Sequence, residues 1–157
     1  MTTSQGKEKL LQEVDSIVQE AFAWFEGTGL TSQVRVEEWG AWDVLAHFLF
    51  WHQLAIDSLE SVTKGGPPLG IPAPLDETNA MALTRQAGKS IPDLAPEWRG
   101  LHDTYLDRVR SFSELDAPVR MRGDGTHLNI VQQLEMNARH IRGHMQQLQE
   151  AEGSNPS

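Results

Sequence analysis

The chain has 157 residues, of which 39% are apolar and 22% charged, and it contains no cysteine. This length suits a single domain over residues 1–157 with its own core, and the missing thiols exclude disulfides and cysteine metal ligands. A formal net charge of −9 without a basic cluster argues against nucleic acid as a partner. We expect no membrane contact and a cytoplasmic location, since no apolar run could cross a bilayer and no signal-peptide core is visible.

The first two predicted helices differ in how much of their surface is apolar. In residues 7–25, apolar side chains recur every three or four positions, which predicts an amphipathic helix that ends at Gly27. The second helix, from about residues 39–41 to 62, is apolar on nearly every side, so we place it centrally in the domain. The same surface could form a homodimer interface, which the sequence does not separate from core packing.

A glycine- and proline-rich segment at residues 65–74 separates the second helix from the rest of the chain. Asp76 is predicted to cap a short helix that reaches Gln86 or Ala87. Ser90 then marks the start of a third long helix. Thr126 is predicted to cap a fourth long helix, whose apolar residues alternate in the three- and four-residue spacing of a bundle seam.

Four long amphipathic patterns without a convincing run of strands predict an all-α fold, a four-helix bundle. The longest connection, between the second and third helices, carries the short extra helix. A crossover of this length lets those two helices run parallel, so the second and fourth helices are expected to be antiparallel. His47 in the second helix would then lie level with His140 and His144 in the fourth.

These three histidines form a candidate metal site. His140 and His144 stand four residues apart, so they project from one face of a helix. Together with His47 they would offer three imidazoles, a ligand set that suits Zn, and also Ni, Fe or Mn, and leaves a position for water or substrate. The competing interpretation is that the pair arises by chance among six histidines and faces solvent.

Other polar residues are open to two interpretations. Asn137, one turn before His140, could orient a ligand or contact substrate, or it could be a surface amide. Asp43 could accept the ring N–H of His47 or simply favour the helix N-terminus. The five tryptophans are interpreted as core residues in preference to pocket residues. The remaining histidines are not expected to be ligands: His52 is predicted to be a core residue, His102 a surface or boundary residue, and His127 part of the first turn of the fourth helix.

Two motifs together resemble the DinB/YfiT-like superfamily, which includes the N-terminal domains of mycothiol-dependent maleylpyruvate isomerases. They are WDVLAHF at residues 42–48, followed by Trp51-His52, and HIRGH at residues 140–144, followed by Gln147-Leu148. The resemblance covers essentially the whole chain in helix order and spacing. It implies an up-down-down-up four-helix bundle with a divalent metal on His47, His140 and His144. The segment 76–80 with Arg85 is similar to an element of the ClbS/DfsB type of self-resistance hydrolases.

The resemblance also implies an activity. Similar proteins are metal-dependent enzymes that transfer a low-molecular-weight thiol to a small electrophilic substrate or isomerise it. Because this chain has no cysteine, the thiol would come from outside. Asn137, Trp51 and Arg85 are the predicted substrate contacts. Two alternatives stay open, a metal-dependent hydrolase of a small substrate and a non-catalytic bundle that binds a small molecule or toxin.

Overall fold

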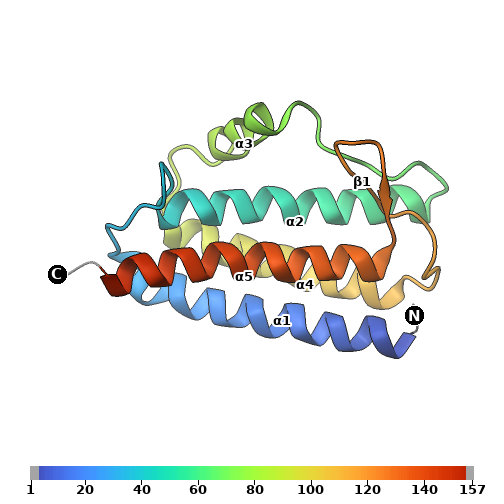
Figure 1. The fold of residues 1–157 in the computed structure, drawn as a ribbon, viewed down its shortest axis with the longest axis horizontal. Coiled ribbons are helices and arrows are strands. Elements are labelled where there is room, and N and C mark those ends of the chain that lie inside the picture. The colour runs from blue at the N-terminus through green and yellow to red at the C-terminus, as the bar shows by residue number, and fades with distance from the viewer. Residues whose placement is uncertain (1–3, 155–157) are drawn as a thin grey trace.

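Helices make up almost all of the regular structure (Figure 1). The computed structural model describes residues 4–154. The all-α prediction is confirmed, with one small two-stranded sheet added. None of the helices in this range combines the length and the apolar character needed to cross a membrane. The elements are α1 (Ser4–Glu26), the 3-10 helix η1 (Thr28–Leu30), α2 (Ala41–Thr63), α3 (Leu75–Thr84), α4 (Ile91–Ser111), β1 (Arg120–Met121), β2 (His127–Leu128) and α5 (Ile130–Ser154).

The four long helices lie side by side along their length, and the short α3 lies against α2 on the outside (Figure 1). The largest helix–helix contact joins α2 to α4, and α1 packs on both α5 and α4. In Figure 1, α2 and α4 run from left to right, whereas α1 and α5 run from right to left. The middle of α5, which carries His140 and His144, therefore lies beside the first half of α2, which carries His47.

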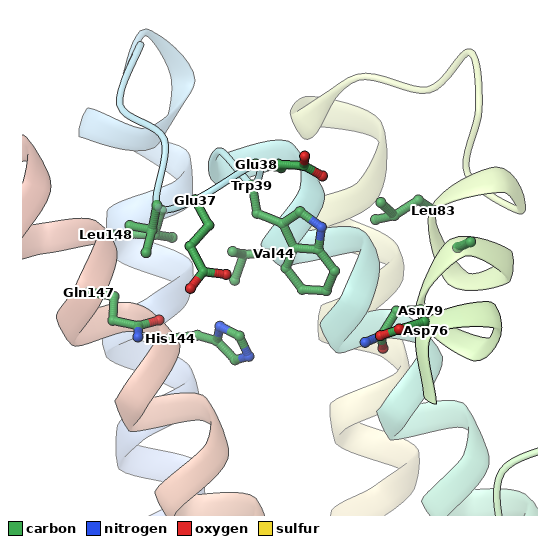
Figure 2. A pocket seen from close by; sticks show the side chains of 12 residues that line it. Glu37, Glu38, Trp39, Val44, Asp76, Asn79, Leu83, His144, Gln147 and Leu148 are labelled. Atoms are coloured by element: carbon green, nitrogen blue, oxygen red, sulfur yellow. The ribbon is translucent and has the colours of Figure 1, made fainter. Parts of the chain in front are cut away.

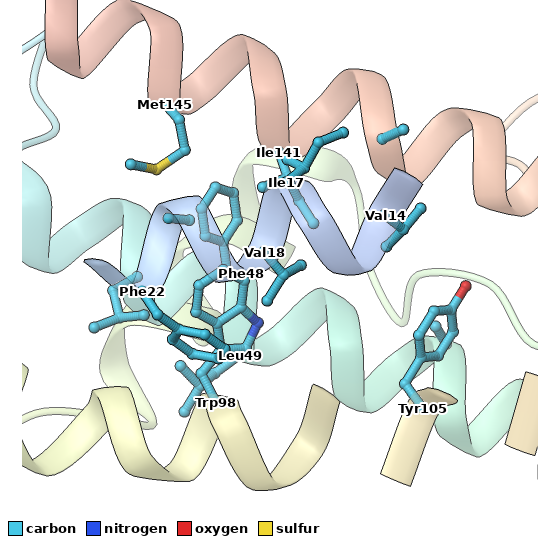
Figure 3. Packing of buried hydrophobic residues seen from close by; sticks show 14 of the residues in the cluster. Val14, Ile17, Val18, Phe22, Phe48, Leu49, Trp98, Tyr105, Ile141 and Met145 are labelled. Carbon is cyan, nitrogen blue, oxygen red and sulfur yellow. The ribbon is translucent and has the colours of Figure 1, made fainter. Parts of the chain in front are cut away.

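The core is built around large aromatic side chains from three helices (Figure 3). Trp98 of α4 is fully buried, with its ring 4.7 Å from the Phe22 ring of α1 and 5.1 Å from the Phe48 ring of α2. Most residues in the first half of α2 are buried. This agrees with the central position expected for a helix that is apolar on all sides. Each large apolar side chain buried here contributes roughly 1.5–3 kcal/mol.

At the starts of α2, α4 and α5, side chains accept hydrogen bonds from free backbone N–H groups. At α4 the prediction is confirmed: Ser90 Oγ accepts from the Asp93 N–H, and Asp93 Oδ2 accepts from the Ser90 N–H. At α3 the prediction is wrong, because the helix begins at Leu75 and Asp76 lies in its first turn. The short helix also ends earlier than predicted, at Thr84.

The predicted start of the last helix is also wrong. Asn129 and Gln132 bond reciprocally, backbone N–H to side-chain oxygen, and so open α5. Thr126 instead belongs to a hairpin turn, where its N–H and hydroxyl both donate to Asp124 Oδ1. This turn joins β1 to β2, in which Arg120 pairs with Leu128. His127 consequently lies in β2, not in the first turn of α5 as predicted.

A second pair of histidines crosses the core between α1, α2 and α4. Trp98 Nε1 donates to His52 Nδ1 (3.1 Å), His52 Nε2 lies 3.2 Å from His102 Nδ1, and His102 Nε2 lies 2.9 Å from Asp15 Oδ1. An indole can only donate and a carboxylate can only accept, so the direction of every hydrogen bond in this series is determined. Both histidine rings therefore carry their proton on Nε2. His52 is a core residue as predicted, whereas the prediction for His102 is wrong because its side chain is fully buried.

These buried rings should make the fold sensitive to acid. Burial lowers the pKa of His52 to about 3 and lowers the pKa of His102 against the opposing effect of Asp15. Below the unfolded value of about 6.5 the unfolded chain binds protons that the folded chain does not, so stability present above that pH is lost as pH falls. We expect the free energy of unfolding in urea, with chelator present, to fall between about pH 7.5 and pH 5, by up to about 1.4 kcal/mol per pH unit for each such histidine. The variant His127→Asn, which removes an exposed histidine, should show the same dependence of the free energy of unfolding on pH. A free energy of unfolding that does not change with pH would contradict the conclusion that His52 and His102 are buried in the neutral form.

Candidate metal centre

The three histidines predicted as ligands converge between α2 and α5. His47 Nε2 lies 2.9 Å from His140 Nε2, which lies 3.1 Å from His144 Nε2. One nitrogen from each ring falls within 4.8 Å of the other two. Because His140 and His144 are one turn apart on α5, both rings reach the same side, where the antiparallel α2 supplies the third. His140 and His144 are therefore not an isolated pair on a solvent-facing surface, because His47 lies against them.

The surroundings keep all three rings uncharged. Burial lowers the pKa of His47 to about 2, and the neighbouring His140 and His144 add to the shift. Burial also lowers the pKa of His140 to about 4, with contributions from His144 and from the positive charge of Arg120. The pKa of His144 is lowered by burial as well. At neutral pH each ring is therefore in the uncharged form, which is the form in which histidine binds metals.

This donor set fits a divalent cation. Nitrogens about 2.0–2.1 Å from one tetrahedral ion lie roughly 3.3 Å from each other, close to the separations of 2.9 and 3.1 Å found here. Three neutral imidazoles suit Zn or Ni and also accept Fe or Mn. Three protein ligands leave at least one coordination position free, which is the pattern of catalytic sites and not of structural ones.

Two tryptophans border the centre. Trp51 Nε1 donates to His47 Nδ1 at 3.1 Å, and its ring centroid lies 6.0 Å from that of His140. The Trp39 ring lies 4.7 Å from the His47 ring and stacks on His144 at 6.0 Å. Both indoles are only half-buried. Trp39 packs against the core and also lines a neighbouring cavity, so the interpretation of the tryptophans as core residues is incomplete for it. Trp51 contacts the ligand rings and is not part of the core cluster, so that interpretation is wrong for Trp51.

A cavity of about 800 Å³ opens beside the centre, and His144 is part of its lining (Figure 2). Figure 2 shows His144 and Glu37 on one side of this space and Asn79 and Asp76 of α3 on the other. The residues lining it are Val36, Glu37, Glu38, Trp39, Val44, Asp76, Asn79, Ala80, Leu83, His144, Gln147 and Leu148. Its volume is that of a small-molecule site. The exposed carboxylates of Glu37, Glu38 and Asp76 make its rim acidic.

Asn79 connects α3 to the centre. Its amide lies close enough to His47 to favour the protonated form of that ring. Its Oδ1 is nevertheless buried without a regular hydrogen bond to any residue in the described range. The sequence did not predict the proximity of Asn79 to His47. Residues 76–80 stood out there only through a family resemblance, which gave Asn79 no role.

The other predicted site residues lie at different distances from the centre. Asn137, one turn before His140, donates to the Tyr105 hydroxyl at 2.7 Å and so faces the bundle interior. The Arg85 guanidinium lies over the Phe50 ring and lines two shallower clefts, away from the cavity beside His144. Asp43 Oδ2 accepts from the Gly40 N–H at 2.9 Å, which is a helix-capping contact and not a contact with His47.

Comparisons with known proteins agree with this geometry. The family model described as the DinB superfamily matches residues 3–148. The chain belongs to this superfamily, as its two histidine motifs indicated. No curated protein and no solved structure matched the chain.

Removing one ligand should abolish stoichiometric metal binding. Replacing His144 with alanine leaves two imidazoles, and we expect affinity for Zn²⁺ or Ni²⁺ to fall by about a hundredfold or more in calorimetric titration of chelator-treated protein. His127→Ala, which removes an exposed imidazole in β2, should bind metal as the unaltered chain does. Unchanged metal content in His144→Ala would show that the three rings do not form a metal site.

Proposed function

We propose that this DinB-superfamily protein is a divalent-metal-dependent enzyme that transfers a low-molecular-weight thiol to a small electrophilic substrate or isomerises that substrate. The observation that carries the proposal is the meeting of three neutral imidazoles, of which His144 lines a cavity of about 800 Å³. The family match supports it, because the match includes all three histidines. Zn or Ni is the proposed ion, with Fe or Mn as alternatives.

His47, His140 and His144 would hold the ion. Bound there, a divalent cation supplies Lewis acidity, which lowers the pKa of a thiol or water and polarises a carbonyl group. The half-buried Trp39 and Trp51 cover the ligand rings and limit access by bulk water. With no cysteine in the chain, the protein contributes no thiol of its own, so the thiol is a second substrate.

We assign Asn79 a positioning role at His47. If His47 binds through Nε2, its proton must lie on Nδ1, and that N–H needs an acceptor. In this structure Trp51 Nε1 donates to His47 Nδ1, which puts the ring proton on Nε2. Metal binding through Nε2 would move that proton to Nδ1 and displace the Trp51 contact, because an indole only donates. Asn79 Oδ1 is the buried acceptor beside the ring that has no other partner among the described residues. An amide oxygen at this position would fix the tautomer of the ligand, as carboxylates and carbonyls do at other metal sites.

The finer topology belongs to the same proposal. We assign the four long helices to the up-down-down-up bundle expected from the family, with the crossover that contains α3 carrying Asn79 to the cavity. Arg85, directly after α3, stays a proposed substrate contact that would act from the clefts beside Phe50. Asn137 also stays a proposed substrate contact, from its position facing the bundle interior. A homodimer through the apolar surface of α2 also stays a proposal.

Turnover assays separate the proposed activity from its two alternatives. The metal-loaded protein is incubated with a panel of small thiols and electrophiles. Electrophile loss, thioether formation and isomer formation are followed by liquid chromatography coupled to mass spectrometry. We expect turnover that requires both metal and thiol and that is lost in His144→Ala. Electrophile loss without thiol would favour the hydrolase, and saturable binding without turnover would favour the binding protein; either result would contradict thiol transfer.

The role of Asn79 makes a separate prediction. Asn79→Leu keeps the size of the side chain but removes the acceptor, so metal affinity should fall by about 10–100-fold. Asn79→Asp, which restores an acceptor, should recover most of that affinity. As a control, Thr84→Val at the exposed end of α3 should leave metal affinity unchanged. Equal metal affinity in Asn79→Leu and the unaltered chain would remove the positioning role.

A further inference from the structure

Arg120 is a buried charge with no ion-pair partner among residues 4–154. Its side chain on β1 is 5% exposed, and its Cζ lies 4.9 Å from the centroid of the Trp51 ring. Nε is buried and makes no hydrogen bond to the residues that the structure describes. Burial lowers the pKa of Arg120 to about 10, so the guanidinium stays charged at neutral pH. Within residues 4–154 the other arginines are exposed to water, and five of them also lie within ion-pair distance of a carboxylate: Arg35, Arg99, Arg108, Arg110 and Arg142.

An arginine in this state is destabilising unless something neutralises it. A guanidinium removed from water loses its hydration, and buried charges in proteins are normally paired or fully hydrogen-bonded. The stacking on Trp51 compensates only part of that loss. The donors of Arg120 are therefore available to an anion from outside the chain.

Several contacts place Arg120 at the inner side of the metal centre. The indole beneath its guanidinium is that of Trp51, which donates to His47. Its charge lowers the pKa of His140 and couples to the Tyr105 hydroxyl. Arg120 thus lies close to the ligand rings, next to Trp51, and is not among the residues that line the cavity beside His144.

Two further donors in this region are not used within the chain. The buried Tyr105 hydroxyl accepts from Asn137 but donates to no residue in the described part, and burial raises its pKa so that it keeps its proton. Gln133, one turn before Asn137 on α5, is fully buried, and both polar atoms of its amide lack partners among residues 4–154. Buried polar atoms without partners are rare and mark places where a ligand or water completes the structure.

We infer that Arg120, together with Tyr105 and Gln133, binds the carboxylate of a small organic substrate whose other end reaches the metal centre. A planar guanidinium matches a carboxylate with two parallel N–H···O bonds. A single positive charge balances a single negative one, and the acidic rim formed by Glu37, Glu38 and Asp76 disfavours polyanions such as phosphate esters. The inference rests on the proposed function for its link to turnover, but the anion site itself requires no metal.

Binding of propionate to metal-free protein, compared with the neutral propionamide, tests this inference. The titration is followed by NMR through the Arg120 Nε–H and Trp51 indole N–H signals, which report on the site directly. We expect propionate, and not propionamide, to shift both signals saturably. Arg120→Gln should weaken propionate binding by about tenfold or more, whereas Arg122→Gln, an exposed arginine of the same hairpin, should not.

A second variant covers the case in which Arg120→Gln does not fold. Gln133→Leu removes the amide that lacks partners, so it should raise the melting temperature of the ligand-free protein and weaken propionate binding. His144→Ala should still bind propionate, which keeps loss of the metal site distinguishable from loss of the anion site. Equal shifts with propionate and propionamide, absence of a saturable shift, or unaltered propionate binding in the folded variants would overturn the inference and leave Arg120 with a structural role.

Discussion

The removal of imidazoles from water is the constraint on which the rest of this structure depends. Five of the six histidines lie in or beside the core, where burial lowers their pKa values and keeps them neutral. A neutral imidazole still has one donor and one acceptor nitrogen, and each needs a partner once water is excluded. The chain meets this requirement in one histidine group and leaves it incomplete in the other.

The two groups show how the same residue type is used for packing and for binding. In the first, Trp98, His52, His102 and Asp15 form a complete donor-to-acceptor sequence that joins three helices. In the second, three Nε2 atoms point toward one another and cannot all be satisfied by protons. A cation that accepts three lone pairs resolves that conflict, so the arrangement that is poor for an apoprotein is suitable for a metal site.

The sequence predicted the parts of this molecule that follow from helical periodicity. The four-residue spacing of His140 and His144, and the long crossover that sets the direction of α2 against α5, were enough to bring His47 to them. Contacts from irregular segments were not predictable in this way. Thr126 was assigned to a helix cap because a hairpin of two-residue strands has no periodic pattern, and Arg120 on that hairpin was therefore missed. His102 was placed near the surface because a histidine beside an apolar face gives no sign of an acceptor on another helix.

The two histidines of α2 also restrict how that helix can change. His47 and His52 are five residues apart and so point in directions roughly 140° apart around the helix axis, one toward α5 and the other toward α4. Inserting or deleting one residue between them would turn one ring away by roughly 100° and detach it from its partners. The turn and a half of helix between the two rings therefore has a fixed length, because both histidine groups depend on it.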